Sequence, residues 1–244
     1  MAKTAAALII GNEILTGKVA EQNVYVMAKE LFALGVELRR IVVCPDEIDT
    51  IARDLRELKA EHDIVITSGG VGPTHDDVTI KAVAKAFDQK VVRAIQYEHL
   101  LRDYYGERLT EMHLRMADVP EGARLLATPE MRWPTVAVDN VFVLPGVPQI
   151  FRAKVAILRE ELKGSGMFYS RALYVGLDEP TLAPLLDEVS AAHTEVNIGS
   201  YLHWGDDADY RTKLTVDGRD QALVERCFEA LVAGVPKERL VRVE

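Results

Sequence analysis

Glycines and small polar residues gather in one loop of the 244-residue chain. Gly69, Gly70 and Gly72 follow an apolar run and precede an amphipathic stretch, so we expect them between a buried strand and a helix. Such glycines let the backbone approach a ligand and aim successive N–H groups into one concavity, and the helix start adds further donors. With Ser68 and Thr74 as hydroxyl donors, the loop predicts a site for a phosphorylated, nucleotide-like ligand. A tight strand-to-helix turn without a ligand is the alternative.

Two carboxylates lie at the predicted start of the helix that follows this loop. Asp76 and Asp77 precede Thr79 there, and either aspartate could cap the helix. Carboxylates beside a phosphate repel it unless a cation lies between them, which makes Mg²⁺ or a similar hard ion a candidate cofactor. We expect one aspartate to cap the helix and the other to face the ligand, and the residue types alone do not choose between them.

Two more loops follow predicted strands and contain glycine. One begins with Gly11, Asn12 and the carboxylate Glu13, and the other contains Pro145 and Gly146. In an open α/β sheet, ligands bind beyond the carboxyl ends of the strands. We therefore expect the three loops to converge on one rim of a sheet and to form one binding site.

The elements that must position these loops alternate between short apolar runs and helical patterns. This alternation is typical of a mostly parallel sheet covered by helices on both faces. The expected strands are 5–10, 36–44, 63–68 and 141–144, and the expected helices are 24–34, 48–58, 77–87 and 150–162, with Ile150, Phe151, Val155, Leu158 and Leu162 on the buried face of the last. The region 90–140 predicts two short helices, at 97–105 and 109–116, and two antiparallel strands, at 123–127 and 135–138.

A second, smaller module follows a boundary at residues 164–166, where two glycines flank a serine. Its strands are expected at 171–177, 195–203, 210–217 and 240–243, and its helices at 180–192 and 220–231. This βαββα order with a last strand is that of a small α+β sandwich. We therefore divide the chain into residues 1–165 and 168–244.

Composition restricts the class of protein. Charged residues make up 27% and apolar residues 48%, which is typical of a globular protein. No apolar run is long enough to cross a bilayer, and the formal charge of −9 argues against a nucleic-acid binder. The two cysteines, Cys44 and Cys227, have no metal-site spacing and indicate core residues of a reducing, cytoplasmic environment.

The three loops resemble the molybdopterin-binding (MoCF biosynthesis) domain superfamily. The motifs are Gly11-Asn-Glu13, Thr67-Ser-Gly-Gly-Val-Gly-Pro-Thr-His-Asp-Asp-Val-Thr79 and Leu144-Pro-Gly-Val-Pro148. Within it, the chain is similar to the N-terminal domain of CinA-type competence/damage-inducible proteins. Arg132-Trp-Pro134 also resembles the N-terminal domain of eukaryotic FAD synthases. The resemblance covers roughly residues 4–165, and CinA-type chains also have a small α+β module after this domain.

The resemblance implies a three-layer αβα fold, a small-molecule nucleotide or pterin phosphate as ligand, and a homo-oligomer, either a dimer or a trimer. It places the ligand on Ser68, Gly69, Gly70 and Gly72. It also implies that Glu13 and Asp77 are the acidic catalytic and metal-binding residues, because the matching reactive carboxylate immediately precedes Val78 and Thr79.

Three segments depart from the family pattern. Asn12 replaces an aspartate, residues 113–117 replace an Asn-x-x-Gln-Ala segment, and residues 131–134 replace a Gly-Thr-Ala-Pro-Gly segment. The amidase domain of full-length CinA is absent from this sequence, so we expect no deamidation of nicotinamide mononucleotide.

Three functions fit these residues. The first is metal-dependent hydrolysis of a nucleotide diphosphate such as ADP-ribose or FAD, in which backbone donors neutralise the diphosphate and a carboxylate orients water. The second is binding or adenylation of molybdopterin. The third is a non-catalytic nucleotide-binding module, which the replacement at position 12 favours.

Overall fold

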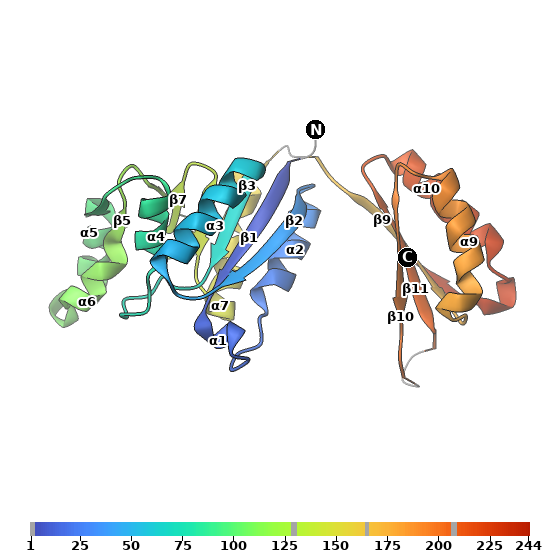
Figure 1. Ribbon diagram of the computed structural model, residues 1–244, viewed down its shortest axis with the longest axis horizontal. Helices are drawn as coiled ribbons and strands as arrows, with labels where there is room; N and C mark the ends of the chain where they lie inside the picture. The colour runs from blue at the N-terminus through green and yellow to red at the C-terminus, as the bar shows by residue number, and fades with distance from the viewer. Residues whose placement is uncertain (1–2, 128–130, 164–165, 206–208) are drawn as a thin grey trace. The chain divides into compact units, whose positions relative to one another are not determined.

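The computed structural model describes residues 3–127, 131–163, 166–205 and 209–244. The chain divides into two compact units, Met1–Ser165 and Gly166–Glu244, and Figure 1 shows each of them. Gly164 and Ser165, which belong to the boundary predicted from sequence, lie outside the described residues.

A six-stranded sheet forms the centre of the first unit, with strand order β2-β1-β3-β8-β7-β6. The first four strands in this order are parallel, and β7 and β6 continue the sheet in antiparallel fashion. The predicted mostly parallel sheet is confirmed. In sheet order, the strands are Glu37–Cys44, Thr4–Ile10, Ile64–Ser68, Val141–Leu144, Thr135–Val138 and Arg124–Leu126.

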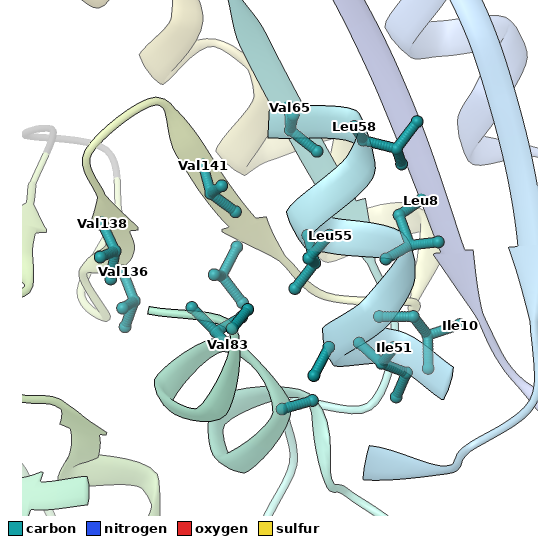
Figure 2. Packing of buried hydrophobic residues seen from close by; sticks show 14 of the residues in the cluster. Leu8, Ile10, Ile51, Leu55, Leu58, Val65, Val83, Val136, Val138 and Val141 are labelled. Carbon is teal, nitrogen blue, oxygen red and sulfur yellow. The ribbon is translucent and has the colours of Figure 1, made fainter. Parts of the chain in front are cut away.

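Buried strands explain the near-continuous apolar runs of the sequence. Every residue of β3 and β8, and all but the first of β1, is buried, as expected for parallel strands covered on both faces. One face packs against α3 (Ile48–Glu61) and α4 (Thr79–Ala86). Figure 2 shows this cluster, with Ile51 and Leu55 of α3 and Val83 of α4 packed beside the strands.

The other face of the sheet packs against α2 (Asn23–Ala33), α7 (Pro148–Val155) and α8 (Ile157–Glu161). Helices therefore lie on both faces, and the three-layer αβα architecture is confirmed. A short helix, α1 (Asn12–Leu15), follows β1.

Two details of the predicted helices were wrong. The helix after the glycine loop begins at Thr79 rather than at residue 77, because the Asp77 carboxylate binds within the loop. The single helix predicted over residues 150–162 is two helices, α7 and α8, that meet at Ala156. Ile150, expected on the buried face, is 42% exposed, because the first turn of α7 lies at the rim of the sheet.

Residues 91–120 form an excursion beside α4. Two three-residue strands, β4 (Val91–Arg93) and β5 (Asp118–Pro120), pair with each other, and the sequence did not predict them. Between them lie α5 (Ile95–Tyr105), α6 (Glu111–Leu114) and the 3₁₀ turns η1 (Gly106–Arg108) and η2 (Arg115–Ala117). Tyr97 and Leu101 anchor this excursion in a small apolar cluster that includes Trp133.

The second unit is an antiparallel sheet with two helices on one face, as predicted (Figure 1). The strand order is β10-β11-β9-β12. Its elements are β9 (Tyr169–Val175), α9 (Glu179–Ala192), β10 (Asn197–Leu202), β11 (Thr212–Gly218), α10 (Gln221–Gly234), η3 (Lys237–Arg239) and β12 (Leu240–Val243). Both units have apolar cores of their own. No helix in the described ranges is long and apolar enough to span a membrane.

Candidate functional site

Three strand-end loops meet at one rim of the first sheet because β1, β3 and β8 are neighbours and run parallel. Their carboxyl ends lead into Gly11, Gly69 and Pro145. The Gly69 N–H donates to the carbonyl of Leu144 at 3.1 Å, which joins the second loop to the third. In Figure 1, α1 and the beginning of α7 lie at this same end of the sheet.

Close backbone packing fixes the glycine loop. Gly69 has a φ of +113°, and a Cβ atom there would lie 2.1 Å from the carbonyl oxygen of Ile10. Gly70 has a φ of +63°, and a Cβ there would lie 2.4 Å from the Thr79 hydroxyl. Both positions therefore require glycine, for conformation as well as for space.

The loop presents unpaired donors. Within the described part of the chain, the N–H groups of Gly70, Val71 and Gly72 donate to no acceptor. Successive free N–H groups in a glycine-rich turn form a concavity with positive partial charge, which suits an oxyanion. The predicted phosphate cradle thus has its donors available.

Asp77 binds its own loop through one carboxylate oxygen. Its Oδ2 accepts from the Thr74 N–H at 2.8 Å and from the Thr74 hydroxyl. The other oxygen, Oδ1, has no donor among the described residues. The carboxylate is therefore held in place while half of its accepting capacity stays free.

Two predicted ligand-binding residues point their hydroxyls into the protein. Thr79 is buried, and its hydroxyl donates to the Gly69 carbonyl at 2.8 Å. Ser68 is also buried, and its hydroxyl accepts from the side chain of Asn23 at 2.9 Å. Both hydroxyls therefore stabilise the loop through hydrogen bonds in the protein interior.

Asn23 joins two loops and was not singled out from the sequence. The side chain is 2% exposed, and its Nδ2 donates both to the Ser68 hydroxyl and to the Gly146 carbonyl, at 2.9 and 2.8 Å. Since these partners lie 45 and 123 residues away, only the fold brings them together. In the sequence, the only indication of this role was that Asn23 is a polar residue at the start of a predicted helix.

A cleft of about 940 Å³ opens in front of the three loops. Eight of the predicted site residues line it, namely Glu13, Gly69, Gly70, Gly72, Thr74, Asp77, Pro145 and Gly146. Five others do not contribute to its wall as the structure describes it, namely Gly11, Asn12, Ser68, Asp76 and Thr79. Asn12 is exposed, and its N–H donates to Asp46 rather than facing the cleft.

Part of the cleft lining is aromatic. Tyr97 and Trp133 line it, and their ring centroids are 6.1 Å apart. Trp133 also stacks on Tyr105 at 6.2 Å, which holds the indole in place. Burial raises the pKa of Tyr97 to about 12, so this phenol stays neutral at physiological pH. Aromatic side chains in a cleft suit the ring of a nucleotide or pterin.

Three basic side chains, those of Lys81, Arg115 and Lys154, also line the cleft. Sequence reasoning did not identify them. Lys154 had a signal, since it lies three residues after Phe151 and four before Leu158, beside the apolar stripe of its helix. These cations offset the carboxylates of a chain whose formal net charge is −9.

The acidic residues can hold a metal ion only with help from a ligand. No group of three His, Cys, Asp or Glu side chains that could hold a metal ion occurs within residues 3–127, 131–163, 166–205 and 209–244. Glu13 and Asp77 nevertheless line the same cleft. One or two carboxylates, completed by phosphate oxygens and water, form a donor set that Mg²⁺ accepts. The residues present therefore fit a cation that binds together with a phosphorylated ligand.

Two family models match the chain, one after the other. Residues 6–163 match a family described as a probable molybdopterin binding domain. Residues 167–244 match the middle domain of FAD synthase. The resemblance inferred from the three loop motifs is confirmed.

Relatives of the whole chain include an archaeal protein and longer proteins. A protein of Archaeoglobus fulgidus is 31% identical, with 91% of this chain and 95% of the relative covered. A probable FAD synthase of Caenorhabditis briggsae is 32% identical over 94% of this chain and 49% of the relative. A CinA-like protein of Desulfosudis oleivorans is 36% identical over 77% of this chain and 49% of the relative. The chain thus spans about half the length of the latter two proteins.

Among solved structures, the fold is similar to that of the protein CinA, of unknown function, from Thermoplasma acidophilum. The TM-score is 0.61 and the identity 32%, with 66% of this chain and 98% of the CinA chain covered.

Proposed function

Since the chain belongs to the family of probable molybdopterin binding domains, we propose that it is an enzyme that hydrolyses a nucleotide diphosphate, such as ADP-ribose or FAD, with the help of a divalent metal ion. The match of residues 167–244 to the middle domain of FAD synthase and the relatives named probable FAD synthase support a nucleotide as ligand. The proposed activity concerns this chain and not the longer relatives as a whole.

The main support for the proposal is that one cleft of the described structure contains both free backbone N–H groups and a carboxylate with one oxygen that accepts no hydrogen bond. Gly70, Val71 and Gly72 offer donors to one phosphate, and the unpaired Oδ1 belongs to Asp77 in the same loop. A volume of about 940 Å³ is at the upper end of the range for small-molecule sites, which suits a dinucleotide. Trp133 and Tyr97 offer a surface for a ring.

The chemistry that follows is addition of water to a phosphorus atom of the diphosphate. The bond between that phosphorus and the bridging oxygen breaks, and two phosphomonoesters leave. Asp77 Oδ1 accepts the proton of the attacking water, and the N–H groups of residues 70–72 stabilise the charge on the phosphoryl oxygens. A divalent cation held by Glu13 and ligand oxygens would supply positive charge to the diphosphate.

Exchange of a single carboxylate tests this assignment. Asp77→Asn keeps the size of the side chain and removes its basicity, so we expect turnover of ADP-ribose to fall at least about a hundredfold. Asp76→Asn is the matched control, because Asp76 is the exposed neighbour that does not line the cleft in the described structure. Initial rates with excess Mg²⁺ measure both. Equal activity of Asp77→Asn and the native protein would overturn the role of Asp77.

Molybdopterin binding or adenylation is the second candidate, and the family description favours it. The same N–H groups and aromatic side chains suit a pterin phosphate. A molybdopterin derivative that co-purifies with the native protein, detected by its fluorescence after oxidation, would support this function. A nucleotide-binding module without catalysis is the third, supported by Asn12 in place of the usual aspartate.

A further inference from the structure

Lys154 is a cation of the cleft that lacks a carboxylate partner. Its Nζ donates to the backbone carbonyls of Trp133 and Pro134, at 3.0 and 2.6 Å. No carboxylate of the described residues forms an ion pair with it, whereas Lys85 and Arg39, for example, pair with carboxylates at the surface. An ammonium group has three donors, so one N–H of Lys154 remains without an acceptor in the described structure.

This arrangement is costly for the free protein. A half-buried ammonium loses part of its hydration, and two neutral carbonyls replace only some of it. Burial lowers the pKa of Lys154 to about 8, so the group is still mainly protonated at pH 7. A methionine or leucine at this position would continue the apolar stripe of α7 without that cost.

Among the described residues, no other charged group of the cleft neutralises the Lys154 ammonium or competes strongly with it for an anion. Asp118 accepts from Arg93 at 2.6 Å, so its charge is already compensated. Lys81 and Arg115 are exposed to solvent, which weakens their attraction for an anion. Glu13 and Asp77 line the cleft but form no ion pair with Lys154 in the described structure, and Tyr97 is neutral. Lys154 is therefore the cleft cation with the strongest demand for a counter-charge.

We propose that Lys154 binds an oxyanion of the ligand and selects ligands that contain a phosphate over phosphate-free rings. The proposal deepens the function proposed above, because it assigns a phosphate-recognition residue to the same cleft. Its two bonds to residues 133 and 134 also link phosphate binding to the segment that holds the Trp133 indole.

Titration calorimetry with the intact protein tests the proposal. The probes are ADP-ribose, inorganic pyrophosphate and adenosine, without added metal. Lys154→Gln keeps donors for the two carbonyls but loses the charge, and we expect its Kd for ADP-ribose and pyrophosphate to rise at least about tenfold. Lys163→Gln is the control, since it removes the same charge from an exposed ion pair with Glu160. Adenosine should bind all three proteins equally.

The pH dependence gives a second test, and its main measurement uses the native protein. Deprotonation of Lys154 above its pKa of about 8 removes the charge, so the native protein should bind ADP-ribose more weakly at pH 9 than at pH 7. The same change should be smaller in Lys154→Gln and undiminished in Lys163→Gln. An unchanged Kd in Lys154→Gln, or a native affinity that does not fall between pH 7 and pH 9, would overturn the proposal.

The experiments distinguish failure of the Lys154 oxyanion site from failure of the proposed hydrolysis. Tight binding of ADP-ribose that depends on Lys154, without hydrolysis when metal is added, would contradict the enzyme and uphold the oxyanion site. Hydrolysis with an unaffected Kd in Lys154→Gln would do the reverse.

Discussion

Side chains at the rim of the sheet either face the cleft or hold the loops in place. A mutation should therefore affect either ligand chemistry alone or both ligand binding and stability. Asp77 and Glu13 present carboxylates to the cleft, whereas Asn23, Ser68 and Thr79 hold the loops from within the protein. The first kind should affect ligand chemistry with little change in stability. The second should affect both.

Asn23→Ala should cost about 2 kcal/mol of unfolding free energy, because it removes one buried and one partly buried hydrogen bond. It should also weaken ligand binding, because the loops at Ser68 and Gly146 lose their common partner. Urea denaturation and the KM for ADP-ribose measure the two effects.

Asn140→Ala is a matched control for Asn23→Ala. The Asn140 side chain also donates to two oxygens, the carbonyls of Lys59 and His62, but it lies at the opposite ends of the strands. We expect a similar loss of stability with an unchanged KM. A KM that rises equally in both variants would show that Asn23 acts through global stability alone.

The sequence pointed to two carboxylates that line the cleft, but not to the residues that support the loops. Glu13 and Asp77 lie in short motifs, where type and spacing are visible along the chain. Asn23 and Lys154 depend on partners that only the tertiary fold supplies, namely Gly146 for the first and the Trp133 and Pro134 carbonyls for the second. Local patterns cannot reveal such contacts.

At the level of elements, the glycine loop is fixed by the strand beside it. Gly69→Ala would place a Cβ against the backbone of β1, which cannot move without disturbing the sheet. We expect a loss of about 3 kcal/mol or more of unfolding free energy.

Gly17→Ala provides the comparison, since Gly17 has a φ of +69° but a Cβ added there would meet nothing within 4 Å among the described residues. It should cost only the conformational strain, about 1 kcal/mol. Thermal or urea unfolding of the two variants measures the difference. Equal losses would contradict the close approach of Gly69 to Ile10.

Strands were predictable because buried parallel strands form apolar runs, and the glycine loops marked their ends. The pair β4 and β5 was missed because each strand has only three residues, and most of them are exposed or partly exposed. The break between α7 and α8 was missed because the apolar stripe continues across Ala156, through Val155, Ile157 and Leu158. Periodicity alone did not distinguish one helix from two.

For the whole molecule, the two units have separate cores, and the cleft belongs to the first of them. Its free N–H groups and basic side chains create a local site for an anion in a chain of net charge −9. In the proposed function, attraction of a phosphorylated ligand would therefore be a property of this cleft and not of the overall charge. The dimer or trimer implied by the family remains a prediction.

The most direct measurement is hydrolysis of ADP-ribose, FAD and NAD by the native protein with Mg²⁺, Mn²⁺ or Co²⁺, followed by separation of the products. We predict that at least one of the three is cleaved to two phosphomonoesters, such as AMP and ribose 5-phosphate from ADP-ribose, and that EDTA stops the reaction. If the protein binds these nucleotides but forms no phosphomonoester with any of the metals, the proposed hydrolysis is contradicted.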